Sequence, residues 1–496
     1  MKKLFAILLT SAFLLTGCAA PRLVLTETET AEEVTTAAET NADGGAHNTT
    51  GFCAGFGRRD ITPENSVPLA GYGNTEMRMS AHILDPLYCS CVALKDAEGA
   101  MLLLFNMDLI NMKKDLADML RRMAARSTGV PEEQMLFNCT HTHSGPDTYK
   151  SDTNADIGHW LPKLCTAVRE AAEEAVKDLD ASSILTGAID TDRLNFVRRY
   201  YKENGFVCDN ADYGTGEIIG HESEIDPEMR LIRLVRENQK DIVLANYQAH
   251  PTKTGGYAKT DISADVIGAW RRRAEKDLDV HFAFFQGGAG NVNFGSRISG
   301  EARFTDYHDI GRALNEAMTE GLARNMTETP AGRIRVASSV LTATHQKGDE
   351  DKLDACYQVN ELWTAGKKDE AKTLAVSLGI SSPYEASAII ARQDRPETGE
   401  IYLACYAFGD IAITAAPFEM FCQTEKAIRE ASPFAFTFSC GYSNDRLGYM
   451  PAAECWVNKG YEVVTCRFTA GTAEAINERQ LELLNELKTE ILKKDG

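Results

Sequence analysis

Two histidines stand one residue apart in the segment "FNCTHTHSGP", where an apolar run ends and a Ser-Gly-Pro turn begins. In an extended chain, side chains two positions apart lie on the same face, so His141 and His143 are expected to project together from a strand end. Imidazole is the commonest metal-binding side chain and titrates near neutrality. The pair therefore indicates metal or acid–base chemistry, although two polar residues that cap a strand explain it about equally well.

A third histidine and a carboxylate occupy similar places further along the chain. His250 follows the apolar run "DIVLANYQA", and Glu419 follows "DIAITAAPF". Open α/β sheets bind ligands at strand ends, so both are candidates for the same metal site. An unpaired buried carboxylate is costly, which favours a ligand role for Glu419. A hydrogen-bonded loop histidine and an acidic residue in the first turn of a helix are the alternatives.

The elements expected around these residues alternate between strands and helices. Strands are expected within residues 100–110, 133–141, 182–189, 229–236, 241–249, 280–294, 401–417 and 434–440. Helices are expected within 113–129, 161–179, 263–278, 307–325 and 419–431. This alternation predicts an α/β fold, in which a mixed β-sheet is covered by helices, as a single large domain over residues 51–496. Residues 349–395 indicate a helical insertion, and residues 472–493 an amphipathic helix.

The start of the chain indicates export. Two lysines precede an apolar run that is shorter than the roughly 20 residues needed to span a bilayer. The run ends in Leu-Thr-Gly-Cys, which resembles the lipobox of bacterial lipoproteins, so residues 1–17 are expected to be a signal peptide and Cys18 the lipidated residue. An ordinary cleaved signal is the alternative. Residues 18–50 predict a flexible acidic tether, which would hold the protein at the membrane of the bacterial cell envelope, outside the cytoplasm.

Charge and cysteine usage narrow the function classes. The net charge of -20 argues against a nucleic-acid partner, because phosphates need a basic surface. Twelve cysteines follow Cys18, several within apolar runs, and they are expected to act as small core residues. Cys455 and Cys466 are one possible disulfide pair. Nothing in the pattern indicates an oligomeric state.

Five segments together carry a family resemblance. They occur in the same order and at similar spacing as in the neutral, non-lysosomal ceramidases, over about residues 51–461, and are "GFGRRDITP", "NCTHTHSGP", "FQGGAGNVN", "APFEM" and "GYSNDRLGYMPAAECWVNKGYE". The segment "HTHSGP" is the most specific of them. Residues 349–395 have no counterpart in this resemblance.

The resemblance implies a zinc amidase. Its zinc ligands would be His141, His250, Glu419 and Tyr449. The residues facing the substrate would be His143, Tyr461 and Arg198, with the adjacent Arg199 as the alternative arginine. Zinc held by such ligands activates water and polarises an amide carbonyl. The Gly-rich segment 286–291 permits a close backbone approach near the site, or is a tight turn after a strand.

Three functions fit these observations. The first is an exported, lipid-anchored zinc amidase that cleaves the N-acyl bond of ceramide or a related lipid amide. The second keeps the metal site but hydrolyses another amide or ester. The third is a surface lipoprotein that only binds a ligand or partner, and such a protein has no need of the complete ligand set.

Overall fold

The computed structural model describes residues 51–493 with gaps at 73–77, 204–206, 209–217, 257, 296–303 and 305, together with residues 24 and 25. Those two residues form β1 (Val24–Leu25), which pairs in parallel with β3 (His82–Ile83). The expected signal peptide, Cys18 and the rest of the tether lie outside the described residues.

A large mixed sheet forms the first half of the fold. Its strands follow the order β15-β13-β12-β7-β2-β4-β5-β6, with β17 paired to β7. The pairs β13–β15 and β5–β6 are parallel and the others are antiparallel. The strands are β2 (Cys53–Asp60), β4 (Tyr88–Lys95), β5 (Met101–Met107), β6 (Met135–Cys139), β7 (Asp180–Asp190), β12 (Glu228–Arg236), β13 (Ile242–Tyr247), β15 (His281–Gln286) and β17 (Thr327–Glu328).

A second sheet packs against the first. It has four strands in the order β18-β19-β20-β22. These are β18 (Ile334–Thr344), β19 (Thr398–Phe408), β20 (Ile411–Ala415) and β22 (Phe436–Cys440). One buried apolar cluster joins Ile232 and Phe285 of the large sheet to Tyr406, Ile413 and Phe438 of the small one. The two sheets therefore bury their facing sides against each other.

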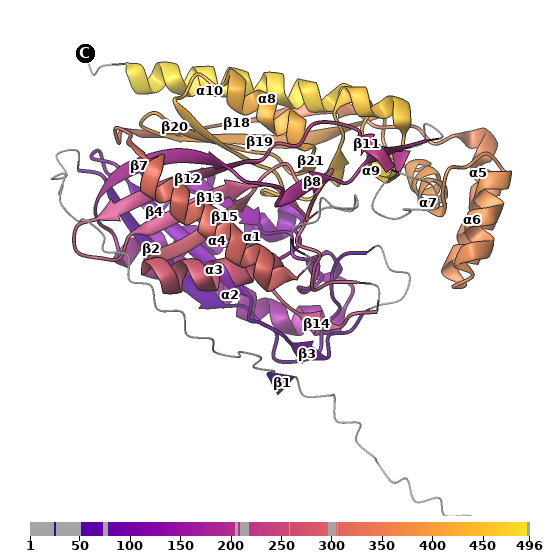
Figure 1. The fold of residues 1–496 in the computed structure, drawn as a ribbon, viewed down its shortest axis with the longest axis horizontal. Coiled ribbons are helices and arrows are strands. Elements are labelled where there is room, and N and C mark those ends of the chain that lie inside the picture. Colours follow the sequence, from indigo (N-terminus) through magenta and orange to yellow (C-terminus); the bar gives the residue numbers. More distant parts are fainter. Residues whose placement is uncertain are drawn as a thin grey trace, which may run out of the picture.

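Helices cover the outer face of each sheet, so that the molecule has four layers (Figure 1). The large sheet is covered by α1 (Lys114–Thr128), α2 (Ala155–Lys177), α3 (Asp265–Leu278) and α4 (Tyr307–Arg324), and the small one by α8 (Cys422–Ala431) and α10 (Thr472–Leu492). In α10 the buried Ile476, Leu483, Leu484 and Leu487 recur at helical spacing, which gives the helix one apolar face. Within the described part of the chain, no helix has the length and apolarity to span a membrane.

A group of three helices stands beside the layers (Figure 1). In the sequence, these helices lie between β18 and β19. They are α5 (Leu353–Thr364), α6 (Lys368–Ser377) and α7 (Pro383–Arg392), within the segment that the sequence indicates as helical. Their apolar side chains, including Val359, Trp363 and Ile389, form a cluster of their own. This group, called the helical insertion below, therefore has its own small core.

Short elements complete the fold near the strand ends. The strand β8 (Asn195–Val197) pairs with β16 (Val292–Phe294), and β21 (Glu419–Met420) pairs in parallel with β23 (Tyr449–Met450). The helix α9 (Tyr461–Thr465) follows the 3-10 helix η4 (Ala453–Asn458). The remaining strands are β9 (Tyr200–Lys202), β10 (Val207–Cys208), β11 (Ile218–His221) and β14 (Asp261–Ile262), and the other 3-10 helices are η1 (Glu132–Gln134), η2 (Thr148–Lys150) and η3 (Glu350–Lys352).

The structure confirms the predicted α/β class, with a mixed sheet covered by helices. It adds strands β2, β4 and β18, which the sequence analysis did not identify, and it shows that the strands expected within 401–417 and 434–440 form a second sheet with β18. Cys455 and Cys466 are both free thiols, so the suggested disulfide between them is wrong. Both are buried, in agreement with a role as core residues.

Candidate metal centre

The site forms where the edge strands β6 and β15 of the large sheet approach each other. Asn138 in β6 accepts a hydrogen bond from the backbone N–H of Gln286 in β15 at 2.8 Å. The amide of Asn138 also donates to the carbonyl of Gly441 at 2.8 Å, just after β22. These buried polar groups need partners, and they find them in each other. Three strand ends are thereby brought together.

Gln286 connects the backbone segments that carry the first two histidines. Its side-chain Nε2 donates to the carbonyl of Thr140 at 3.0 Å and to that of Ala249 at 2.9 Å. These residues directly precede His141 and His250. Gln286 is fully buried, so no water competes for the two bonds. The position of one histidine is therefore fixed relative to the other.

Hydrogen bonds to backbone carbonyls set the tautomers of both rings. Nδ1 of His141 lies 2.7 Å from the carbonyl oxygen of Ile110, and Nδ1 of His250 lies 2.6 Å from that of Ala289. A carbonyl oxygen only accepts, so each Nδ1 carries the proton and donates it. Burial and the Arg198 guanidinium lower the pKa of His250 to about 4, which keeps this ring neutral. Each Nε2 then presents a lone pair, as a metal ligand must.

The lone pairs converge with a third histidine and a carboxylate. Nε2 of His143 lies 3.2 Å from Nε2 of His141. Oε2 of Glu419 lies 3.3 Å from Nε2 of His141 and 3.2 Å from Nε2 of His250. A carboxylate and two lone pairs repel one another at this separation unless a cation lies among them. The three histidines, whose ligand atoms lie within 4.8 Å of one another, could therefore hold a metal ion.

The sequence argument for His141 and His143 was right about their proximity and wrong about its cause. The strand β6 ends at Cys139, and His141 has a left-handed backbone with φ of 67°. Alternation along a strand therefore does not bring the rings together. Burial, followed by the neighbouring His141 and His250, lowers the pKa of His143 well below its ordinary value. Among the described residues, its buried Nδ1 has no hydrogen-bond partner.

Glu419 and Tyr449 reach the site from the second half of the chain. They lie opposite each other in the parallel pair β21–β23, so their side chains are neighbours. The N–H of Gly290 donates to the carbonyl of Met420 at 2.7 Å. A Cβ at Gly290 would lie 2.3 Å from the carbonyl oxygen of Glu419. The Gly-rich segment is therefore needed for a close backbone approach, the first of the two roles considered from the sequence.

The two adjacent arginines have different surroundings. Arg198 donates to the Tyr449 hydroxyl at 3.2 Å and to Glu462 at 2.9 Å. Arg199 pairs with Glu222 and with the other oxygen of Glu462, the latter at 2.8 Å. Arg198 therefore faces the candidate metal site formed by the histidines, Glu419 and Tyr449, and Arg199 is held in a buried ion-pair network behind it.

The structure brings together all seven residues predicted from the sequence. The Tyr461 ring lies 5.4 Å from the Tyr449 ring, centroid to centroid, and so extends the cluster beyond Tyr449. Their division into metal ligands and substrate contacts stays a prediction, and the position of His143 makes it a further possible ligand.

Sequence reasoning missed several supporting residues. These are Gln286 in its bridging role, Glu462, and Tyr442, whose ring lies 4.1 Å from that of His141. Glu462 was detectable in principle, because it directly follows Tyr461 and is the only acidic residue of that short helix.

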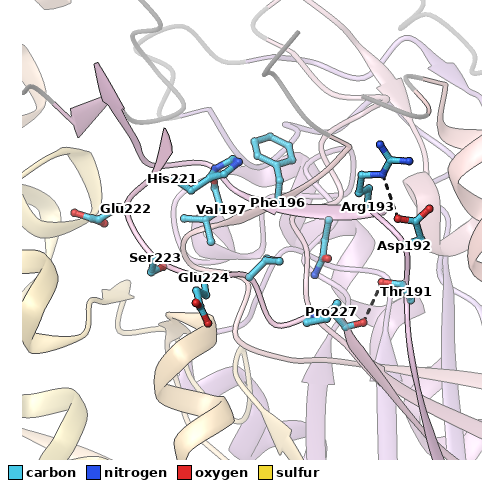
Figure 2. Close-up of a pocket in the computed structure, with 12 residues that line it drawn as sticks. Thr191, Asp192, Arg193, Phe196, Val197, His221, Glu222, Ser223, Glu224 and Pro227 are labelled. Atoms are coloured by element: carbon cyan, nitrogen blue, oxygen red, sulfur yellow. Dashed lines mark hydrogen bonds and ion pairs between the residues drawn. The ribbon is translucent and has the colours of Figure 1, made fainter. Parts of the chain in front are cut away.

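A cavity of about 980 Å³ lies next to the segment that carries Arg198 and Arg199 (Figure 2). Val197, next to Arg198, lines it, and so does Glu222, the partner of Arg199. None of the three histidines is among its lining residues. Figure 2 shows charged and aromatic side chains around it, among them His221 and Phe196. The cavity is thus a neighbour of the metal cluster rather than its immediate surroundings.

Residues 52–295 match the family described as neutral/alkaline non-lysosomal ceramidase, N-terminal. Over these residues, just under half of its length, the chain carries the N-terminal domain of this ceramidase family. His141, His143, Arg198 and His250 lie within the matched residues, and Glu419, Tyr449 and Tyr461 follow them. The comparison with curated proteins gives no match.

Two solved structures of ceramidases share the fold. One is the crystal structure of neutral ceramidase from Pseudomonas aeruginosa, with a TM-score of 0.67 and 18% identity over 90% of this chain and 76% of that one. The other is described as ceramidase complexed with C2, with a TM-score of 0.68 and 18% identity over 90% of this chain and 77% of that one. At this identity the likeness establishes the fold alone.

The bridging role of Gln286 can be tested through metal affinity. Gln286→Met keeps the length of the side chain but removes both hydrogen bonds. The backbone segments that carry His141 and His250 are then no longer held at a fixed distance from each other. We expect the dissociation constant for a divalent metal, measured by chelator competition, to rise about 10- to 100-fold. Gln358→Met, at an exposed position of α5, is the matched control and should leave the affinity unchanged. Equal affinities for the two variants would contradict the bridging role.

Proposed function

We propose that this ceramidase-family protein is a zinc-dependent amidase that cleaves the N-acyl bond of ceramide or a related lipid amide. The observation that carries the proposal is the convergence of His141 and His250, with Nδ1 protons donated to backbone carbonyls, on the Glu419 carboxylate. The donor set fits zinc, because neutral imidazoles and a carboxylate are its ordinary ligands. Tyr449 would complete the set. Zinc bound there would polarise the scissile carbonyl and make water a better nucleophile.

Arg198 and His143 would handle the substrate. The Arg198 guanidinium is a fixed positive charge next to the cluster, suited to an oxygen that gains negative charge when the carbonyl is attacked. His143, whose Nε2 lies 3.2 Å from Nε2 of His141, would contact the substrate or carry the proton in transit. Hydrolysis adds the oxygen of water to the carbonyl carbon and one of its protons to the departing amine. The products are a carboxylic acid and an amine.

A second candidate is a zinc hydrolase of a more polar amide or ester. The observation that favours it is the adjoining cavity, whose walls include Asp192, Arg193, His221 and Glu224. These four side chains could bind polar groups of a substrate, next to the apolar Phe196, Val197 and Ile225 that line the same cavity. The two candidates share the metal site and differ in the substrate alone.

We also propose that the protein is exported and anchored to the membrane of the bacterial cell envelope through Cys18. Support for this comes from the lipobox-like sequence and from the acidic, Thr-rich residues that follow it. A tethered enzyme would meet lipid substrates at or near a membrane surface. The anchor and the hydrolase activity are independent proposals.

Activity can be tested with a panel of ceramides of different chain length, other N-acyl amides and polar esters. We expect lipid amides to be hydrolysed, zinc to be present at about one ion per chain, and a chelator to abolish the reaction until zinc is restored. Preference for polar amides or esters would favour the second candidate. Protein that binds lipid amides and holds zinc but hydrolyses nothing would contradict both, and would support a binding protein.

Substitution of the histidines separates ligands from substrate contacts. His141→Ala and His250→Ala should each lose both zinc and activity. His143→Ala should keep its zinc and lose activity by about 10²- to 10⁴-fold, as expected when a proton-transfer group is removed. His159→Ala, at an exposed position of α2, is the control. If His143→Ala also loses its zinc, His143 is a ligand and its assignment to the substrate is wrong.

Replacement of the candidate acylation site tests the anchor. Cys18→Ser removes the thiol that would carry the lipid, so the protein should leave the membrane fraction and should not incorporate labelled fatty acid. Cys53→Ser, at the start of the described domain, is a control that keeps Cys18. Membrane attachment that is unchanged in Cys18→Ser would refute lipidation at this residue and leave the hydrolase proposal intact.

A further inference from the structure

The short helix α9 carries two residues next to the side chains that are predicted to face the substrate, a region called the substrate side of the site below. Tyr461 is its first residue, and its ring lies against that of Tyr449. Glu462 follows, fully buried, and its two oxygens accept hydrogen bonds from Arg198 at 2.9 Å and Arg199 at 2.8 Å. A shift of α9 would therefore move Tyr461 and, through Glu462, the two arginines together.

A helix of five residues cannot hold its own position. The helix α9 has no side-chain cap at its start, and its last carbonyls need partners from elsewhere. Arg392, at the end of α7, donates to the carbonyls of Val464 and Cys466, the latter at 3.3 Å. The Gln346 amide, just after β18, donates to the carbonyl of Cys466 at 3.0 Å. Both donors flank or belong to the helical insertion, which thus holds the end of α9.

A row of edge-to-face rings makes a second connection, at the start of α9. Trp363 in α5 lies 5.3 Å from Tyr384 in α7, at an interplanar angle of 66°. Tyr384 lies 4.9 Å from Tyr461 at 75°, and Tyr461 lies 5.4 Å from Tyr449 at 73°. These separations and angles are those that aromatic pairs favour. The row of rings runs from the core of the insertion to Tyr449 in the candidate metal site.

The position of Tyr384 is itself fixed by the sequence "SPYE". Ser382 caps α7 by accepting a hydrogen bond from the N–H of Glu385, and Pro383 occupies the first helical position. The Glu385 side chain returns to the N–H of Ser381 at 2.6 Å, in a variant of the capping box. Tyr384 is therefore presented from a rigid helix start, and its ring packs on the insertion core on one side and on Tyr461 on the other.

We propose that the helical insertion positions the substrate side of the site, and that Tyr384 is the positioning residue that sets the orientation of Tyr461. The inference rests on the proposed function, since Tyr461 must contact the substrate for its orientation to matter. It assigns a role to a segment that has its own core and that contains none of the three histidines grouped as possible metal ligands. Tyr384 acts through Tyr461 and does not touch the reacting atoms.

The test compares Tyr384→Phe, Tyr384→Leu and Tyr384→Ala in the full chain, with a short-chain ceramide as substrate. Phe keeps the edge-to-face contact and should retain wild-type kcat/KM. Leu and Ala remove the ring and should lower kcat/KM by about ten- to a hundredfold, as expected for a misplaced substrate contact. Zinc content should stay at the wild-type level in all three. Tyr357→Ala, on the exposed surface of α5, is the control and should leave kcat/KM unchanged.

A double-mutant cycle separates positioning from a general effect on folding. If Tyr384 acts through Tyr461, then Tyr384→Leu should cost little in a Tyr461→Ala background. Additive losses, a loss of zinc in the Leu variant, or a Leu variant as active as wild type would each overturn the inference. In the last case the wild type still hydrolyses ceramide, so the proposed function stands. A wild-type protein that neither binds nor hydrolyses any lipid amide overturns both.

Discussion

Two hydrogen bonds from imidazole to backbone, His141 to Ile110 and His250 to Ala289, are the constraint on which the site depends. In each, Nδ1 donates its proton to a backbone carbonyl, so Nε2, which points toward the other ligand candidates, keeps its lone pair. With the tautomers fixed, the direction of both rings follows from the backbone alone. The site is therefore only as well defined as the chain segments behind it, and Gln286 ties those segments to each other.

The surrounding structure maintains several local conformations that a short peptide would avoid. His141 and Tyr442 both have left-handed backbones, at φ of 67° and 52°, and their rings lie 4.1 Å apart. Such conformations cost about 1–3 kcal/mol each and persist only where packing determines them fully. The close approach of Gly290 to Glu419 is a third case. All three lie at the cluster, where the geometry of the ligands leaves the backbone little choice.

The sequence predicts the part of the fold that depends on long apolar runs. β5, β13 and β15 have such runs, whereas β2 contains two glycines and two arginines, and β18 alternates half-buried with exposed residues. Patterns of that kind do not stand out from loops, and strand partners far apart in the sequence cannot be read from a pattern at all. The sequence analysis therefore missed β18 and did not show that the strands expected within 401–417 and 434–440 form a second sheet, although it predicted the class of fold.

Within the site, strand ends drew attention to His141, His250 and Glu419, and the family resemblance supplied Tyr449, Tyr461 and Arg198. Neither could distinguish Arg198 from Arg199, because the two are adjacent and differ only in their partners, Glu222 above all. The bridging amide of Gln286 was equally out of reach. An amide side chain has no intrinsic preference for a carbonyl 146 residues away, and only the assembled fold selects that partner.

The candidate metal site also connects the two halves of the chain, because each half supplies some of its side chains. The histidines come from the residues that match the family, whereas Glu419 follows them and is held through Gly290, which donates to Met420, and Asn291, which accepts from the N–H of Cys422 at 2.9 Å. An anionic side chain from one half faces imidazoles from the other. A cation between them would bind both halves at once, so metal binding and the docking of the two halves stabilise each other. The same glycines and amides that allow this approach therefore serve the fold as much as the site.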